Sequence, residues 1–190
     1  MQILPTSIAD VLLLEPAVFG DERGYFLESY NRRTLLEAGI ACDFVQDSAS
    51  YSRAGVLRGL HYQKGRFAQS KLVRVVSGRI FDVALDIRPD SSSFGQWTGT
   101  ILSGENNRQL FIPKGFAHGF IVLSEAAHVA YKTDAYWAPQ SEGAIDALDA
   151  QLAIDWGIPP EQCIRSPKDQ AAGSWAQYLG NPDFVGKEAL

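Results

Sequence analysis

The chain has 190 residues, close to the usual size of one globular domain, and its 46% hydrophobic and 21% charged residues exclude a disordered or fibrous protein. Its formal net charge of −5 argues against binding to nucleic-acid polymers, because proteins that bind them usually carry an excess of basic residues. Two cysteines are too few for a disulfide framework, and no secretory signal or run of about 18 apolar residues is present. We therefore expect one soluble, cytoplasmic domain over residues 1–190.

A first helix is predicted over residues 32–38, because Asn31 can cap its start and Gly39 can end it. Alternating or β-branched runs then predict strands, and turn signals such as Ser77-Gly78 separate them. The predicted strands are residues 44–51, 56–63, 71–76, 79–88, 97–102, 109–112, 117–123 and 128–136. A last helix is predicted over residues 170–179, after a start at Ser166-Pro167.

This order of elements predicts an all-β fold, a sandwich or jelly-roll barrel with short flanking helices near the N-terminal third and the C-terminus. Barrels of this kind bind small ligands in their mouths. Within the strand at 79–88, Asp82 and Asp86 fall on one face with Ile80 and Ala84, while the opposite face is fully apolar. We therefore expect the two carboxylates to lie on one face of this strand and the hydrophobic side chains to cover the other.

Histidine is scarce, with three in the chain, so each can be weighed. His61 and Arg58 both interrupt an apolar strand pattern, and an imidazole can shuttle protons near neutral pH. Judged alone, His61 is better explained as a hydrogen-bonded core histidine. His118 ends a Pro-x-Gly-x-x-His turn typical of cupin barrels, but the His-x-His pair of metal-binding cupins is missing. His128 has no ligand spacing to either, so we expect no metal site.

Other features each have two explanations. Lys71 is either a solvated edge charge or a functional cation, and Tyr131 is either a core tyrosine or part of a site. Asp169, after Lys168, favours the start of a helix whether or not it carries chemistry. Residues 20–26 combine a turn, an arginine and aromatic rings, which suit either phosphate and base binding or an ordinary surface hairpin. Composition does not separate these alternatives.

Nine segments, taken in order, carry a resemblance to a known family. They are VFGDERG (18–24), VLRGLHYQ (56–63), KLVRV (71–75), FDVALDIR (81–88), FGQW (94–97), LSGEN (102–106), PKGFAHGF (113–120), YKT (131–133) and SPKD (166–169). Together they resemble the dTDP-4-dehydrorhamnose 3,5-epimerase family over residues 8 to about 172. The resemblance implies a cupin-type jelly roll, a homodimer that uses neither metal nor organic cofactor, and a step of L-rhamnose biosynthesis for cell-surface polysaccharide.

The substrate implied by the resemblance is dTDP-4-dehydro-6-deoxy-D-glucose, inverted at C3 and C5 to dTDP-4-dehydro-L-rhamnose. Both carbons flank the C4 ketone, so an enolate at C4 can serve both inversions with one base and one acid. The resemblance makes His61 the base, oriented by Asp169, and Lys71 the cation that stabilises the oxyanion. It makes Tyr131 the acid on the opposite face of the sugar.

The resemblance also implies how the substrate is bound. It places Arg23 and Arg58 on the diphosphate, with Arg23 reaching the neighbouring subunit's site, and it gives His118 and Tyr136 contacts near the sugar. The remaining implied substrate-binding residues, for the nucleoside and for added positive charge, are Phe26, Glu28, Gln46 and Lys168.

Three segments depart from the family pattern. Ser48 stands where Asn is usual, Tyr136-Trp137 replaces a Tyr-Tyr pair, and residues 146–149 read Asp-Ala-Leu-Asp in place of a more usual Arg/Leu-Trp-Asn/Asp-Asp. These departures weaken the rhamnose assignment more than the epimerase assignment. The alternatives are an epimerase that inverts only C3 or C5 of a related dTDP-4-keto sugar, and a non-catalytic cupin that binds a sugar nucleotide.

Overall fold

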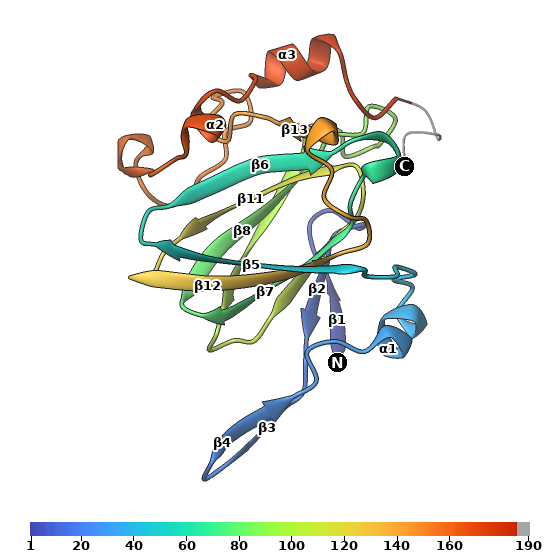
Figure 1. The fold of residues 1–190 in the computed structure, drawn as a ribbon, viewed down its shortest axis with the longest axis vertical. Helices are drawn as coiled ribbons and strands as arrows, with labels where there is room; N and C mark the ends of the chain where they lie inside the picture. The colour runs from blue at the N-terminus through green and yellow to red at the C-terminus, as the bar shows by residue number, and fades with distance from the viewer. Residues whose placement is uncertain (186–190) are drawn as a thin grey trace.

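The computed structural model describes residues 1–185, in which two β-sheets face each other and short helices lie at the margins (Figure 1). One sheet has the strand order β1 (Gln2–Pro5), β2 (Leu12–Glu15), β10 (Gln109–Ile112), β7 (Lys71–Ser77), β12 (Ala126–Thr133), β5 (Gln46–Arg53). The other has the order β13 (Glu142–Ala144), β6 (Leu57–Gln63), β11 (Phe116–Val122), β8 (Arg79–Asp86), β9 (Trp97–Ser103). Strands β3 (Val18–Asp21) and β4 (Gly24–Leu27) form a separate hairpin that projects from the body.

The helices are short. They are α1 (Arg32–Glu37), α2 (Pro167–Gln170) and α3 (Trp175–Gly180), with 3-10 turns at Gly65–Phe67, Pro139–Ser141 and Pro160–Gln162. The cap predicted for the first helix is confirmed, since the Asn31 side chain accepts hydrogen bonds from two backbone N–H groups of α1. Gly39 follows with a φ of 85°, a left-handed conformation that suits glycine at a helix end.

The predicted helix over 170–179 is wrong, because the chain forms two helices there. The first, α2, ends at Gln170, and α3 begins only at Trp175. Ser174 caps α3 in a reciprocal pair with Gln177, and Gly173 between the helices gives its carbonyl to the Asp146 backbone N–H. Local capping and this contact outweigh helix propensity over the intervening residues.

Each of the eight predicted strands is present, with ends that shift by a few residues, as at β12. Sequence reasoning missed β1, β2 and β13 and left the hairpin β3–β4 as one of two alternatives. These strands are three or four residues long, too short for a clear period. The all-β expectation is confirmed.

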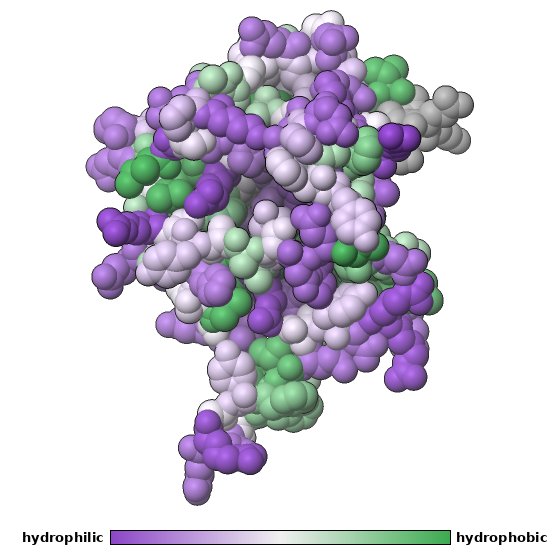
Figure 2. All heavy atoms as spheres, in the orientation of Figure 1, coloured by the Kyte–Doolittle hydropathy of each residue, from purple (hydrophilic) through white to green (hydrophobic). Residues whose placement is uncertain are grey.

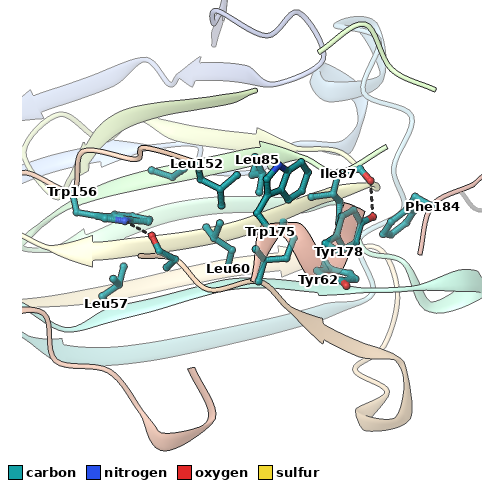
Figure 3. Close-up of a cluster of buried hydrophobic side chains, with 14 of the residues drawn as sticks. Leu57, Leu60, Tyr62, Leu85, Ile87, Leu152, Trp156, Trp175, Tyr178 and Phe184 are labelled. Atoms are coloured by element: carbon teal, nitrogen blue, oxygen red, sulfur yellow. Dashed lines mark hydrogen bonds between the residues drawn. The ribbon is translucent and has the colours of Figure 1, made fainter. Parts of the chain in front are cut away.

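The buried hydrophobic side chains of residues 1–185 form three clusters, in keeping with two packed sheets covered on their outer faces. The cluster between the sheets contains Val73 and Val129 from one sheet and Ile80 and Phe120 from the other. A second cluster lies where the C-terminal segment covers the five-stranded sheet, and Figure 3 shows Trp156, Trp175, Tyr178 and Phe184 packed on side chains of β6 and β8. The third cluster lies against α1.

Strand β8 differs from its expected half-polar character, because both of its faces are covered. Phe81, Val83 and Leu85 pack in the cluster beneath the C-terminal segment, while Asp82 and Asp86, with zero exposed surface, lie on the face toward the opposite sheet. The alternating sequence pattern assigns these side chains to the correct faces of β8. It does not reveal that the face with the two aspartates is also buried.

Within residues 1–185, no helix is long and apolar enough to cross a membrane.

Candidate active site

A cavity of about 140 Å³ lies between the two sheets and receives side chains from both. Its lining brings together residues predicted from separate motifs. They are Ser50, Lys71 and Tyr131 from the six-stranded sheet and Arg58, His61, His118, Gly119 and Phe120 from the five-stranded sheet.

An irregularity at Gly59 turns Arg58 and His61 toward the same side of β6. The pairing of β6 with β11 shifts its register here, whereas a regular strand would place residues 58 and 61 on opposite faces. Gly59 has a φ of 121°, and a Cβ on it would lie 2.5 Å from the Gly119 Cα. Only glycine fits such a close approach. The apolar run that His61 interrupts is therefore a bulged strand that directs two polar side chains inward.

His61 forms a short hydrogen bond with a buried carboxylate from the far end of the chain. Its Nε2 lies 2.5 Å from Asp169 Oδ1, and Asp169 Oδ2 accepts a hydrogen bond from Ser166 Oγ at 2.9 Å. Burial alone would raise the pKa of the Asp169 carboxyl, but hydrogen bonds from His61 and Ser166 and the charge of Arg165 hold the pKa below its usual value. The ionised Asp169 fixes the imidazole with its Nε2–H toward the carboxylate.

Lys71 is a buried cation beside this pair. Its Nζ donates a hydrogen bond to the His61 carbonyl oxygen at 3.3 Å, and only 8% of its surface is exposed. Burial lowers the pKa of Lys71 to about 8, against the opposing charges of Asp82 and Glu142. The ammonium is therefore available near neutral pH in a site with little water to screen it.

His118 pairs with Asp82, a partner that sequence reasoning did not assign. His118 Nε2 lies 2.8 Å from Asp82 Oδ1, while Asp82 Oδ2 is buried without a hydrogen-bond partner among the described residues. Burial lowers the pKa of His118, and Asp82 only partly opposes the effect. In the pairing of β11 with β8, Asp82 stands opposite Phe120 rather than His118, so strand spacing gave no direct signal of this contact.

Several other predicted binding residues form hydrogen bonds close to the cavity, in two separate groups, one of which includes Glu142, whose charge acts on Lys71 and His61. Arg58 Nε donates to Ser52 Oγ at 3.0 Å. Lys168 is bonded to Glu142, whose second carboxylate oxygen accepts from Trp137 Nε1 at 2.9 Å. The network continues to Gln46, whose Oε1 accepts the Trp137 backbone N–H at 2.9 Å, and the neighbouring Tyr136 is 66% exposed.

The predicted residues of the hairpin are not in this cavity. Arg23 is 90% exposed and pairs with Asp21 at the hairpin tip, Phe26 is 69% exposed, and Glu28 is exposed just after β4. The single chain thus brings together Arg58, His61, Lys71, His118, Tyr131 and Asp169, and leaves Arg23, Phe26 and Glu28 outside. In the described part of the chain, no three His, Cys, Asp or Glu side chains are grouped so as to hold a metal ion.

Comparison with known proteins then decides the family. A family model described as dTDP-4-dehydrorhamnose 3,5-epimerase matches residues 5–177. The chain belongs to that family. The dTDP-4-dehydrorhamnose 3,5-epimerase of Salmonella typhimurium is 54% identical over 182 residues, which cover 94% of this chain and 98% of that protein. That of Escherichia coli K12 is 53% identical over 173 residues, covering 90% and 92%.

Solved structures of similar proteins support the same family assignment. A dTDP-6-deoxy-D-glucose-3,5-epimerase from Legionella pneumophila, solved in complex with dTDP-4-keto-L-rhamnose, superposes with a TM-score of 0.89 at 53% identity and covers 96% of this chain and 94% of that one. An epimerase from Mycobacterium tuberculosis superposes with a TM-score of 0.92 at 34% identity, covering 99% and 95%. The expected cupin-type fold and family are confirmed, and the chain is an isomerase of dTDP-sugars in L-rhamnose biosynthesis.

Proposed function

We propose that this chain inverts C3 and C5 of dTDP-4-dehydro-6-deoxy-D-glucose, giving dTDP-4-dehydro-L-rhamnose, by removing and returning protons next to the C4 ketone without a cofactor. The observation that carries this proposal is the placement of His61 and Tyr131. They come from opposite sheets and line one cavity. An inversion requires a base on one face of the sugar and an acid on the other, and two facing sheets supply that arrangement.

His61 acts as the base. Because Asp169 engages Nε2, the C–H proton is taken up at Nδ1, which forms an imidazolium next to the carboxylate. The electron pair of the broken C–H bond moves into the ring and onto the C4 oxygen as an enolate. The negative Asp169 stabilises the imidazolium throughout the step.

Lys71 stabilises the enolate oxygen. An ammonium held in a buried site interacts with a developing oxyanion more strongly than it does in water, and an effect of this kind lowers a barrier by about 3 kcal/mol. Tyr131 then donates its phenolic proton to the same carbon from the opposite face. Before the next inversion, the His61 imidazolium releases its proton to solvent and Tyr131 recovers one from solvent. Repeating the cycle at the second carbon uses the same ketone and the same three groups.

The nucleotide half of the substrate is bound at the mouth. We assign Arg58 to the diphosphate, since a guanidinium suits bidentate contacts with phosphate oxygens, and Gln46 to the nucleoside. His118 and Tyr136 contact the sugar. Lys168 already pairs with Glu142, so its positive charge reaches the ligand only in part.

We propose that a homodimer completes the site, with Arg23, Phe26 and Glu28 of the hairpin meeting the partner's ligand. The hairpin's aromatic side chains lie exposed, and Figure 2 shows hydrophobic atoms between its polar tip and the body. On the outer face of the six-stranded sheet, a hollow of about 330 Å³ is lined in part by Ser29, Leu72 and Ala130, and Ser29 lies two residues after the hairpin. Light scattering of the purified protein should give the mass of a dimer, and a monomer that is fully active would contradict the arrangement.

We place the protein in the cytoplasm, the compartment that the sequence favours. Both Cys42 and Cys163 are free thiols in the structure, which suits a reducing environment. Fractionation of the producing cells tests the location.

The reaction is tested by incubating the protein with dTDP-4-dehydro-6-deoxy-D-glucose in deuterated water and following the sugar by NMR. Deuterium at both C3 and C5, with inverted configuration, is the expected result. Deuterium at one carbon only would make the chain a mono-epimerase. Tight dTDP binding with deuterium at neither carbon would reduce it to a non-catalytic binder.

A further inference from the structure

The Asp169 carboxylate stands on a very short element. Helix α2 has four residues, and a helix of that length does not hold its own conformation in water. Its cap is local, with Ser166 Oγ accepting the Asp169 backbone N–H at 3.1 Å. The position of this turn relative to β6 must therefore come from contacts outside it.

Arg165 supplies one of those contacts. Its Nη2 donates to the Asp169 carbonyl oxygen at 2.5 Å and to Asp146 Oδ1 at 2.6 Å. The Arg165 side chain is only 10% exposed, and its Nε is buried without a partner among the described residues. Burying a guanidinium with an unpaired N–H costs free energy of folding. Because this guanidinium bonds to both acceptors, it links the α2 turn to the segment that contains Asp146.

That second segment is anchored next to His61. Ile145 exchanges two backbone hydrogen bonds, at 3.0 and 3.1 Å, with Leu60, the residue before His61. The Asp146 backbone N–H donates to the Gly173 carbonyl at 2.8 Å, beyond the far end of α2. Asp146 thus holds the segment 165–173 at both ends, through Arg165 at the start and Gly173 at the end.

We propose that Arg165, with Asp146, is a positioning residue that holds the α2 turn so that the Asp169 carboxylate meets His61. The inference rests on the proposed role of His61 and Asp169 as the proton-abstracting pair. It gives a role to Asp146, which stands at one of the departures from the family pattern. Lysine replaces Arg165 only in part, because both hydrogen bonds come from Nη2 at the end of the longer arginine side chain, a position that a lysine ammonium does not reach.

The test combines kinetics with NMR of the ligand-free protein. Arg165→Met removes two charge-assisted hydrogen bonds, and we expect kcat to fall about 10-fold to 100-fold while KM and dTDP affinity change less than about 2-fold. Arg165→Lys should recover part of kcat. The downfield resonance of the His61 imidazole N–H, bonded to Asp169, should weaken or shift in Arg165→Met.

A double variant separates positioning from general stability. If Arg165 acts through Asp169, Arg165→Met should lower kcat no further in an Asp169→Asn background. Additive losses, or an unchanged His61 resonance with wild-type kcat in Arg165→Met, would overturn the proposal. Arg108→Met is the matched control, since Arg108 also pairs with a sequence-distant acid, Glu15, but lies outside the cavity lining. Its kcat should be that of the wild type.

A second variant covers the case in which Arg165→Met does not fold. Asp146→Asn keeps the Arg165 contact with the Asp169 carbonyl and should give a smaller loss of kcat and a smaller change in the His61 resonance. The NMR signal requires no turnover. If wild-type protein fails to epimerise the sugar, the proposed function fails, while the His61 resonance still reports whether Arg165 positions Asp169.

Discussion

Strand β8 carries Asp82 and Asp86 on the same face, and the two regions around them are built differently. Asp86 accepts hydrogen bonds from the Arg88 backbone and guanidinium and from the hydroxyls of Ser91 and Ser93, at 2.6 to 3.0 Å. Burial would raise the pKa of Asp86, but these donors together hold it below its usual value. Asp82 has one partner, His118, and an oxygen with none in the described structure.

The difference separates a structural carboxylate from one that belongs to a site. Every acceptor position of Asp86 is used to fix the loop after β8, so nothing remains for a ligand. Asp82 lies near Lys71 and His118 and keeps unused hydrogen-bonding capacity, an arrangement that costs stability and is typical of functional sites. Substitutions in the two regions should therefore separate activity from stability.

The largest effect is expected for His61→Ala. Without the base, epimerisation in a coupled assay should fall about 10²-fold to 10⁴-fold, while dTDP affinity stays near wild type. The melting temperature should fall somewhat, because the buried Asp169 carboxylate loses its His61 partner. His128→Ala is the control, since His128 does not line the cavity. Equal losses in the two variants would contradict a special role for His61.

Lys71→Met should lower kcat about 10²-fold to 10³-fold, because a preorganised charge on the oxyanion is lost. The pKa of Lys71 is lowered to about 8, so the ammonium is present below that pH and is lost above it. Wild-type kcat/KM should accordingly fall as the pH rises through about 8, and the residual kcat/KM of Lys71→Met should lack this fall. An unchanged alkaline limb in the variant would assign it to another group.

Asp82→Asn and Asp86→Asn form a direct comparison of the two regions. Asp86→Asn leaves Arg88 without its main partner and should lower the free energy of unfolding by about 3 kcal/mol, with kcat near wild type. Asp82→Asn should lower kcat about 10-fold to 100-fold through His118, with a smaller effect on stability. Denaturant unfolding measures the loss of stability and steady-state kinetics the loss of kcat. A larger loss of kcat in Asp86→Asn and a larger loss of stability in Asp82→Asn would contradict the distinction between the two carboxylates.

The smallest effect is expected away from both regions, at the cap of α1. Asn31→Ala removes the side-chain acceptor of two backbone N–H groups and should cost about 1 kcal/mol of stability. Activity should not change. A loss of activity at wild-type stability would show that α1 contributes to the site.

Local signals predicted local structure well. Asn31 and Gly39 marked the ends of α1, and residues 109–112 formed the predicted strand. The helix over 170–179 was wrong because Ser174 caps a new helix and because Gly173 is fixed by Asp146, a contact between distant segments. Local propensity contains no information about such a contact.

The candidate site was predictable only through the family resemblance. His61 and Asp169 are 108 positions apart, and no spacing rule joins them. The bulge at Gly59, which turns Arg58 and His61 inward together, arises from close approach to Gly119 on another strand. The contacts of Asp82 and Arg165 were missed. The alternating pattern of β8 predicted which face of the strand carries Asp82 but not its partner, and no sequence pattern pointed to Arg165.

The central claim is that the two sheets supply a base and an acid on opposite faces of the sugar, and Tyr131→Phe tests it most directly. In deuterated water, the variant should still exchange the C3 and C5 protons through His61, but the enolate should be reprotonated from the same face, so deuterium enters with the original configuration retained. The rate of inversion should fall about 10²-fold or more while exchange persists. If Tyr131→Phe inverts both carbons at the wild-type rate, the assignment of Tyr131 as the acid is wrong.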